Sequence, residues 1–342
     1  MTGDSSELAG PRREITRLAS DFPFDAADRA RLTAALGEGR LLLARSHDEL
    51  VEIAGAHPEV DVLTPTLYMA DLPPLLPNLR WLALPSAGAD HVTGQPWASG
   101  LGAPIITTAN GVHATPISEH VFSAILIWSR RWPELMRLQT ERAWPHSVIE
   151  KAMYAGRELE DATLLVIGFG AIGRRIARLG RAFGMRALAV RRTAAADATD
   201  PDADAVVAMD QLDALLPEAD YIVIATPGTA ETRGMISAAR LALMKPSAML
   251  INIARGGIVD EAALVAALTS GALGAAALDV TAREPLPTDD PLWSAPNLFI
   301  SPHLTGLSAQ YSRRLTDLLL DNIARYREGR PMRNHVQPAR GY

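Results

Sequence analysis

The 342-residue sequence contains no cysteine, which excludes disulfide bonds, thiolate nucleophiles and cysteine-ligated zinc sites. It also lacks the run of about 18 uninterrupted apolar residues that a membrane-spanning helix needs. The first residues, MTGDSSELAG, contain neither the basic region nor the apolar region of a secretory signal peptide. From these absences we predict a cytoplasmic protein that has no metal site.

Lysine is nearly absent, because Lys151 and Lys245 are the only lysines among 33 basic residues. The 39 acidic residues outnumber the basic ones and give a formal net charge of −6. This balance argues against nucleic acid or an anionic membrane as the partner. Hydrophobic residues make up 48% of the chain, which at this length is enough for two domain cores.

Short apolar segments alternate with helical patterns along the chain, which is typical of parallel α/β sheets. In the first half, strands are expected at residues 41–44, 60–63, 81–84 and 105–107, with helical patterns at 26–36 and 48–54 and a proline-rich segment at 72–76. In the second half, strands are expected at 162–167, 187–190, 221–225, 249–253, 275–278 and 298–300, with helices at 171–183, 238–244 and 261–269.

Two longer helical stretches flank the second series. One covers residues 117–131 and is expected to continue past Pro133 towards Gln139, and the other covers 309–327. We predict two doubly wound domains, in which a Rossmann nucleotide-binding domain (residues 112–305) is inserted into a flavodoxin-like substrate domain (residues 1–111 and 306–342). The active site is expected in the cleft between them.

A glycine loop follows the strand expected at residues 162–167. It reads Gly168-Phe-Gly170-Ala-Ile-Gly173 and opens a helix, so its backbone N–H groups can meet a pyrophosphate. A lone motif of this kind is weak evidence, because a tight turn between a strand and a helix also explains the glycines. Its position between a strand and a helix makes dinucleotide binding the preferred interpretation.

The next strand ends in Arg191-Arg192, where dinucleotide-binding folds usually carry an acidic residue for the ribose 2'-hydroxyl. Two guanidinium groups would instead bind a 2'-phosphate, and the Thr193 hydroxyl would add a donor. We therefore predict NADP(H) in preference to NAD(H), and a reductase in preference to a dehydrogenase. The alternative is that both arginines form an ordinary solvated surface pair.

Three later segments each carry one polar residue suited to carbonyl chemistry. Arg255 ends an apolar strand and precedes two glycines, Glu284 precedes Pro285, and His303 follows another strand. Ligands bind at the carboxyl ends of strands in such sheets. Singly, each residue has an ordinary structural interpretation: a surface arginine, a turn residue and a buried or capping histidine.

Together these segments resemble the D-isomer-specific 2-hydroxyacid dehydrogenases, in particular the glyoxylate/hydroxypyruvate reductases. The resemblance covers about Arg80 to Arg327, and both the order and the spacing of the motifs match. The motifs are GFGAIG, TPGTAETRGMI from Thr226 to Ile236, NIARGGIVDE from Asn252 to Glu261, ALDV from Ala277 to Val280, EPLP from Glu284 to Pro287 and SPHLTG from Ser301 to Gly306.

The resemblance implies a catalytic trio. Arg255 would bind the carboxylate and carbonyl of a 2-oxo acid, and His303 would protonate the carbonyl oxygen as hydride reaches the carbon. Glu284 would bond the imidazole and favour its charged form. In the loop Ser86–His91, the backbone N–H groups of Ala87 and Gly88 would bind the substrate carboxylate.

The resemblance also implies further contacts. The amides of Ala171 and Ile172 would face the pyrophosphate, Thr226 and Pro227 would line the adenosine side, and Asp279 would hold the nicotinamide carboxamide. Ala254 and Gly306 complete the expected cofactor set. The partners would be a small 2-oxo or 2-hydroxy acid and a second copy of the chain, because family members are usually homodimers. Trp144 lies where some relatives place a tryptophan in the partner subunit's pocket, and His120 is interpreted as structural.

Three other functions stay open. An NAD-dependent dehydrogenase of a bulkier hydroxy acid would keep the same trio. A formate or phosphite dehydrogenase would share the scaffold, although formate dehydrogenases place Gln-Pro where this chain has Glu284-Pro285. A dinucleotide-sensing corepressor would be an interaction protein, and the absence of long tails with partner motifs argues against it.

Overall fold

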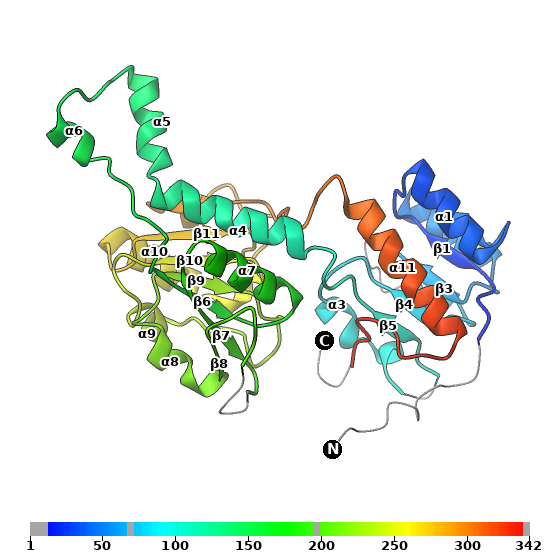
Figure 1. Ribbon diagram of the computed structural model, residues 1–342. Coiled ribbons are helices and arrows are strands. Elements are labelled where there is room, and N and C mark those ends of the chain that lie inside the picture. Colours follow the sequence, from blue (N-terminus) through cyan, green and yellow to red (C-terminus); the bar gives the residue numbers. More distant parts are fainter. Residues whose placement is uncertain (1–12, 67–71, 101, 195–198, 338–342) are drawn as a thin grey trace. The chain divides into compact units, whose positions relative to one another are not determined.

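The computed structural model describes residues 13–66, 72–100, 102–194 and 199–337. The chain forms two compact units, one of residues 1–113 and 308–342 and the other of residues 114–307 (Figure 1). Each unit contains one parallel sheet with helices on both faces, which confirms the predicted fold class. The first is called the outer unit below, because its chain segments lie on both sides of the second in the sequence, and the second is called the inserted unit.

The outer unit has a five-stranded parallel sheet in the order β2-β1-β3-β4-β5. This is the flavodoxin-like order. The strands are β1 (Leu18–Ser20), β2 (Leu41–Leu43), β3 (Val62–Thr64), β4 (Trp81–Ala83) and β5 (Ile105–Thr107). The helices are α1 (Ala26–Leu36), α2 (His47–Ala56), α3 (Asp90–Thr93) and α11 (Tyr311–Arg327), with 3-10 turns at Pro73–Leu75 and Pro96–Ala98.

Alternate strand residues of the outer unit build two cores. Leu18, Val62 and Trp81 pack with apolar side chains of α1 and α11 on one face of the sheet. Ala19, Leu63 and Leu82 pack with α2 and α3 on the other. The period of two along each strand thus buries both faces, as a parallel sheet requires.

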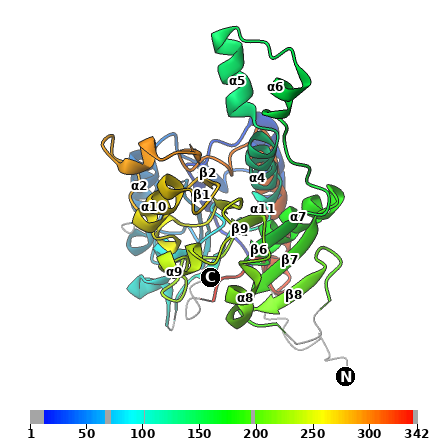
Figure 2. The ribbon, with the colours of Figure 1, turned by 90° about the vertical axis from the view of Figure 1, so that its left-hand side faces the viewer.

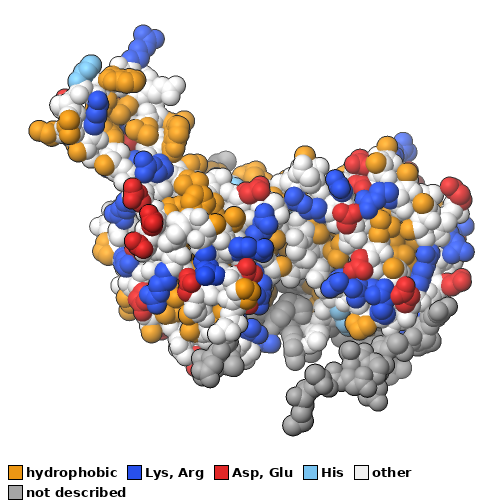
Figure 3. All heavy atoms as spheres, viewed as in Figure 1, with side chains coloured by type: hydrophobic (Ala, Val, Ile, Leu, Met, Phe, Trp, Pro, Cys, Tyr) orange, Lys and Arg blue, Asp and Glu red, His pale blue; other side chains and the backbone are white. Residues whose placement is uncertain are grey.

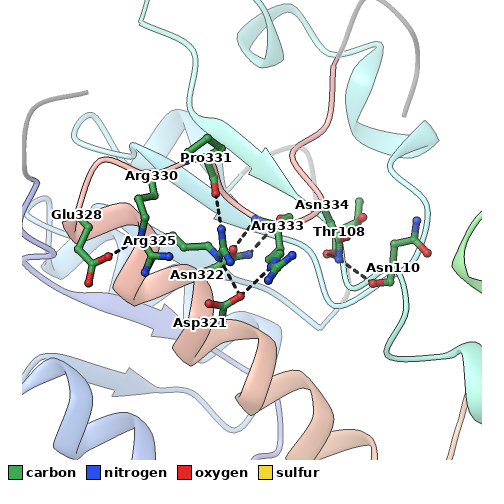
Figure 4. Close-up of polar contacts among 10 residues, drawn as sticks. All are labelled: Thr108, Asn110, Asp321, Asn322, Arg325, Glu328, Arg330, Pro331, Arg333 and Asn334. Carbon is green, nitrogen blue, oxygen red and sulfur yellow. Dashed lines mark hydrogen bonds and ion pairs between the residues drawn. The ribbon is translucent and has the colours of Figure 1, made fainter. Parts of the chain in front are cut away.

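A segment after α11 returns along the edge strand β5. The Val336 N–H donates to the Ile106 carbonyl at 2.8 Å, and the Asn334 side-chain amide donates to the carbonyls of Thr108 and Asn110 at 3.0 and 2.7 Å. Nearby, Asp321 on α11 accepts from Arg325 and Arg333 (Figure 4). These contacts cover the sheet edge and fix the chain just beyond β5.

The inserted unit has a seven-stranded parallel sheet in the order β12-β11-β10-β9-β6-β7-β8. This is the Rossmann order extended by one strand, and the sequence order reverses between β6 and β9. The strands are β6 (Thr163–Ile167), β7 (Arg186–Arg191), β8 (Ala205–Ala208), β9 (Tyr221–Ile224), β10 (Met249–Asn252), β11 (Ala275–Leu278) and β12 (Leu298–Ile300). The helices are α4 (Ala114–Ser129), α5 (Trp132–Glu141), α6 (Val148–Ala152), α7 (Ala171–Ala182), α8 (Leu212–Leu215), α9 (Ala238–Leu241) and α10 (Glu261–Ser270), with 3-10 turns at Met209–Gln211, Gly256–Ile258 and Pro291–Ser294.

Strand alternation again forms two cores in the inserted unit. Leu164 and Val166 of β6 pack against α4 and α7, whereas Leu165 and Ile167 pack against α8, α9 and α10. Gly180 lets α7 approach the sheet closely, since a Cβ there would lie 2.5 Å from the Leu164 side chain. Among the described residues, no helix is both long and apolar enough to cross a membrane.

One helix prediction was wrong. The helix expected to run past Pro133 ends at Ser129, and α5 begins separately at Trp132. Arg131 adopts the left-handed conformation (φ 57°), and Pro133 lies in the first turn of α5, where its missing N–H costs nothing. The strands β1 and β8 were not predicted.

The segment from α5 to α6, called the arm below, extends away from the sheet of the inserted unit (Figures 1 and 2). No residue of α5 or α6 is buried. Large apolar side chains are exposed along it, and Figure 3 shows hydrophobic side chains over its surface. The exposed ones are Trp132, Leu135, Met136, Trp144, Val148, Ile149 and Met153.

Candidate active site

The glycine loop lies between β6 and α7, beside the point where the strand order of the inserted unit reverses. Gly168 has φ 103°, and a Cβ there would lie 2.5 Å from the Ala225 backbone. A Cβ on Gly173 would meet the Gly168 carbonyl oxygen at 2.0 Å. A Cβ on Gly170 would meet nothing within 4 Å, so the loop has open space at the helix N-terminus.

The neighbouring loop after β9 carries Thr226 and Pro227. Thr226 is 6% exposed, and its hydroxyl oxygen is buried without a hydrogen-bond partner among the described residues. Pro227 is exposed, and its carbonyl accepts from the Thr232 hydroxyl at 2.8 Å. An unsatisfied hydroxyl, a glycine cradle and the N-terminus of α7 with Ala171 and Ile172 together fit a dinucleotide.

Arg191 is the last residue of β7, and Arg192 and Thr193 follow it. All three are exposed, so they are placed to reach a ligand group at the carboxyl edge of the sheet. The strand is one residue longer at its end than the sequence indicated, because Arg191 pairs with Ala208 of β8.

Sequence reasoning missed an acidic neighbour of Arg191. Asp200 is ion-paired with Arg174 of α7, and it also feels the charge of Arg191. Burial raises the pKa of Asp200, but the Asp202 amide and the two arginines outweigh it and hold that pKa below its usual value. Positions 189–196 contain no acidic residue, and this carboxylate comes from nine residues beyond Arg191.

His303 and Glu284 form a direct pair in the inserted unit. His303 Nδ1 lies 2.8 Å from Glu284 Oε2, and Thr281 N–H donates to the other oxygen of Glu284 at 3.1 Å. The side chains are 52% and 40% exposed. Since Glu284 occupies Nδ1, Nε2 is the ring atom that can present a proton to a ligand.

His303 has φ 51°, a conformation that costs energy for a residue other than glycine. Its N–H donates to the Asp279 carbonyl at 2.8 Å. The Asp279 carboxylate accepts from the Ser301 hydroxyl at 2.6 Å and from both the hydroxyl (2.6 Å) and the N–H (3.3 Å) of Thr305. Asp279 is 4% exposed, so these hydrogen bonds are kept from water and hold the loop that carries His303 in one conformation.

Asp279 was expected to hold a nicotinamide carboxamide. Its carboxylate also accepts from the Leu304 N–H at 3.0 Å, which gives four internal donors for about four lone-pair sites. A carboxamide would therefore share Asp279 with the loop of His303.

Arg255 lies in the turn after β10. Asn252, fully buried, shapes this turn: its side chain accepts from the Ala254 N–H at 3.1 Å and donates to the Arg255 carbonyl at 2.9 Å. A Cβ on Gly256 would lie 1.8 Å from the Thr281 carbonyl carbon, and one on Gly228 would lie 2.8 Å from the Arg255 side chain. Gly256 brings the Arg255 turn against the segment that carries Glu284, and Gly228 lets the Arg255 side chain approach the loop after β9. Neither of these glycines nor Asn252 was predicted as a site residue.

The expected carboxylate-binding loop belongs to the outer unit. Ser86, Ala87 and Gly88 are half-buried after β4. The Ser86 hydroxyl donates to the Gly88 carbonyl at 2.7 Å, and the Ala109 N–H donates to the Ser86 carbonyl at 2.8 Å. Among the described residues, neither the Ala87 nor the Gly88 N–H donates to another group of the chain.

The remaining predicted residues fall in three places. Ala254 is buried in the Arg255 turn, and Gly306 ends the loop of His303. His120, on α4, places Nε2 3.4 Å from the Ser301 hydroxyl. Trp144 is 78% exposed between α5 and α6, away from this site.

Comparison with known proteins identifies the class. Residues 122–305 match the family model "D-isomer specific 2-hydroxyacid dehydrogenase, NAD binding domain". A glycerate dehydrogenase of Methylorubrum extorquens is 33% identical over 83% of this chain and 87% of its own length. A glyoxylate reductase of Aeropyrum pernix is 34% identical over 78% of each chain. A D-isomer specific 2-hydroxyacid dehydrogenase from Xanthobacter autotrophicus, solved with NADPH and MES, is 29% identical with a TM-score of 0.82 and covers 96% of this chain and 100% of its own.

The chain belongs to the D-isomer specific 2-hydroxyacid dehydrogenase family, which confirms the resemblance seen in the sequence. It is therefore an NAD(P)-dependent oxidoreductase of 2-hydroxy acids and 2-oxo acids.

Proposed function

We propose that the protein reduces a small 2-oxo acid to the D-2-hydroxy acid with NADPH. The observation that carries this proposal is the Glu284–His303 pair, whose 2.8 Å contact occupies Nδ1 and leaves Nε2 as the ring atom for a ligand. Beside it, Asn252 and Gly256 hold the Arg255 turn against Thr281, the residue whose N–H bonds Glu284. A proton donor and a guanidinium in one region suit reduction of a carbonyl next to a carboxylate.

A bound nicotinamide cofactor would supply the hydride to the carbonyl carbon. His303 then delivers a proton from Nε2 to the carbonyl oxygen, and Glu284 stabilises the imidazolium before the transfer. Arg255 orients the substrate and stabilises charge that develops on its oxygen. The loop with Ala87 and Gly88 binds the carboxylate through backbone N–H groups. The carbonyl carbon would gain the hydride and the carbonyl oxygen the proton, so that the carbonyl becomes a hydroxyl group and NADPH becomes NADP⁺.

The preference for NADP(H) rests on Arg191, Arg192 and Thr193 at the end of β7. Two exposed guanidinium groups provide charge-assisted donors for a 2'-phosphate. The relative from Xanthobacter autotrophicus, solved with NADPH, supports this choice by analogy.

Glyoxylate and hydroxypyruvate are the proposed substrates. A relative is named glyoxylate reductase, and another is named for glycerate, whose 2-oxo form is hydroxypyruvate. Both acids are small enough to be bound mainly through the carboxylate and the carbonyl, which are the groups that the proposed residues contact.

We also infer that the working form is a cytoplasmic homodimer in which the arm contacts a second copy. The arm carries seven exposed large apolar side chains, from Trp132 to Met153, and a projecting segment of this kind is costly to leave in water. Trp144, between α5 and α6, is the residue that we expect to enter the partner's surface.

One observation favours a second function, NAD-dependent oxidation of a bulkier D-2-hydroxy acid. Asp200 places a carboxylate beside Arg174 and within the field of Arg191. That negative charge opposes a 2'-phosphate and leaves the ribose of NAD unhindered.

The test is a steady-state panel of glyoxylate, hydroxypyruvate and larger aliphatic and aromatic 2-oxo acids, each with NADPH and NADH. We expect the highest kcat/KM for a two- or three-carbon acid with NADPH. A higher value for NADH with a branched or aromatic acid would favour the second function. No turnover of any 2-oxo acid would instead favour a cofactor-sensing role.

A further inference from the structure

The Pro85 carbonyl, directly before the loop of Ala87 and Gly88, accepts two side-chain hydrogen bonds within the outer unit. The Tyr311 hydroxyl donates at 2.7 Å, and His113 Nε2 contacts the same oxygen at 3.0 Å. The two donors come from opposite ends of the sequence: His113 is the last residue of the unit's first segment, and Tyr311 follows soon after the chain returns at Ser308.

The two side chains also contact each other. Their ring centroids are 4.8 Å apart, and the other side of Tyr311 packs edge-on against Phe22 at 5.2 Å. His113 is 7% exposed, so its donor is kept from water. Burial raises the pKa of Tyr311 to about 12, so its hydroxyl keeps its proton at all ordinary pH values.

These bonds fix the orientation of the backbone. A carbonyl oxygen has two lone pairs, and both on Pro85 are used. Since a peptide group is planar and trans, fixing a carbonyl fixes the N–H of the next residue on the opposite side. The Pro85 anchor thus sets the Ser86 N–H, and the bond from Ala109 to the Ser86 carbonyl sets the Ala87 N–H.

The segment that contains Ala109 is itself held by a side chain from the segment after α11. Asn334 bonds the carbonyls of Thr108 and Asn110 on either side of Ala109 (Figure 4). The peptide groups after Pro85 and Ser86, at the start of the proposed carboxylate-binding loop, are therefore each held by hydrogen bonds. The groups that form these bonds are not themselves proposed to contact the substrate.

We propose that Tyr311 and His113 are positioning residues that fix the Pro85–Ser86 peptide, where the substrate loop begins, and so support the N–H donors of Ala87 and Gly88 that follow it. This inference rests on the proposed function for its ligand, a 2-oxo acid carboxylate. Neither side chain touches substrate in this scheme, so removing either should weaken substrate binding and leave hydride transfer and cofactor binding intact.

The central variant is Tyr311→Phe, which deletes one oxygen and keeps the ring contacts with Phe22 and His113. We expect the KM for glyoxylate to rise about 5-fold, as for loss of one hydrogen bond, with kcat and the Kd for NADPH within about 2-fold of wild type. Tyr326→Phe is the matched control, because it removes a buried hydroxyl from the same helix and keeps the stacking on Trp81. It should leave KM unchanged.

His113 provides a rescue and a double-mutant test. His113→Gln retains an N–H donor and should stay near wild type, whereas His113→Leu should raise KM about as much as Tyr311→Phe. Each single variant leaves Pro85 one donor, but Tyr311→Phe with His113→Leu leaves a buried carbonyl without either. The double variant should therefore raise KM by more than the product of the single effects.

Two readouts without turnover separate this inference from the proposed function. They are the Kd of oxamate, an unreactive 2-oxo acid analogue, for the enzyme bound to NADPH, and hydrogen exchange of the peptide that covers residues 84–92. Faster exchange and weaker oxamate binding in Tyr311→Phe, but not in Tyr326→Phe, would support the inference.

If wild type turns over no 2-oxo acid but exchange still quickens in Tyr311→Phe, the proposed function fails and the anchor stands. The inference is overturned if wild type is active and Tyr311→Phe leaves KM, oxamate binding and exchange unchanged. It is also overturned if kcat and NADPH binding fall in proportion to the change in KM.

Discussion

The proposed ligand site of the inserted unit has two ends, one at His303 and one at Arg191. They differ in how many of their polar groups form hydrogen bonds within the chain. At the His303 end, Asp279 holds the loop through four donors and Glu284 holds the ring at 2.8 Å. At the Arg191 end, the last residue of β7 and the two residues after it are exposed, and the Asp200 carboxylate from another segment carries a charge that interacts with Arg191.

This difference follows from what each end has to do. Proton transfer needs a donor atom held in one place, and internal hydrogen bonds provide that before any ligand arrives. Binding a phosphate needs positive charge that is open to solvent. A nearby carboxylate can weaken the attraction of that charge for the phosphate by partly neutralising it. We therefore expect substitutions at the His303 end to alter catalysis strongly, and those at the Arg191 end to alter the choice of cofactor.

The largest expected effect is that of His303→Ala. Loss of the proton donor should lower kcat by roughly 10²–10⁴-fold, while the Kd for NADPH, measured by fluorescence titration, stays within about 2-fold. Glu284→Gln keeps the size of the side chain but removes the charge, so it should lower kcat less. A fully active His303→Ala enzyme would refute the assignment of the acid.

A second strong effect is expected from Gly256→Ala. The added Cβ would lie 1.8 Å from the Thr281 backbone, so the Arg255 turn must move away from the Glu284 segment. We expect a fall in kcat/KM of at least about 10-fold and a loss of unfolding free energy of about 1–3 kcal/mol in urea. Gly257→Ala is the control, since a Cβ there meets nothing within 4 Å. Equal behaviour of the two variants would show that the close approach has no role.

A third, intermediate effect concerns the cofactor. Arg191→Asp combined with Arg192→Ala should shift the ratio of kcat/KM for NADPH and NADH towards NADH by roughly 10–100-fold, because the 2'-phosphate loses its charged donors. Arg178→Ala should leave the ratio unchanged. It removes an exposed arginine of α7 that pairs with Asp202. An unaltered ratio in the double variant would mean that the two arginines are ordinary surface residues.

The same contrast explains what the sequence could and could not predict. Periodicity located most of the strands and helices and thus the fold class, but it missed β1 and β8. The motifs named Arg255, Glu284 and His303 because each is a polar residue in a segment that matches the family in order and spacing, and because Arg255 and His303 also follow apolar strands. The supports of those residues were not predicted. Asn252 and Gly256 act through contacts with segments that only folding brings near, and the same holds for the Tyr311–Pro85 bond across 226 positions.

The smallest expected effects are those of a substitution at Asp200, which concerns both the stability of the fold and the choice of cofactor at the Arg191 end. Its folded pKa is lowered, so it contributes stability that is present above its unfolded pKa and is lost as the pH falls through the folded value. Asp200→Asn should therefore unfold at lower urea concentration than wild type at neutral pH, and the two curves should converge in acid.

The same substitution should raise the preference for NADPH by a few-fold, because Arg174 and Arg191 are then no longer neutralised. Asp202→Asn is the matched control: it removes a carboxylate two residues away that pairs with Arg178 instead. If the preference moves towards NADH in Asp200→Asn, the carboxylate is orienting the arginines for the phosphate. If it moves equally in both variants, the effect is one of general surface charge, and the Arg191 end has no specific acidic partner.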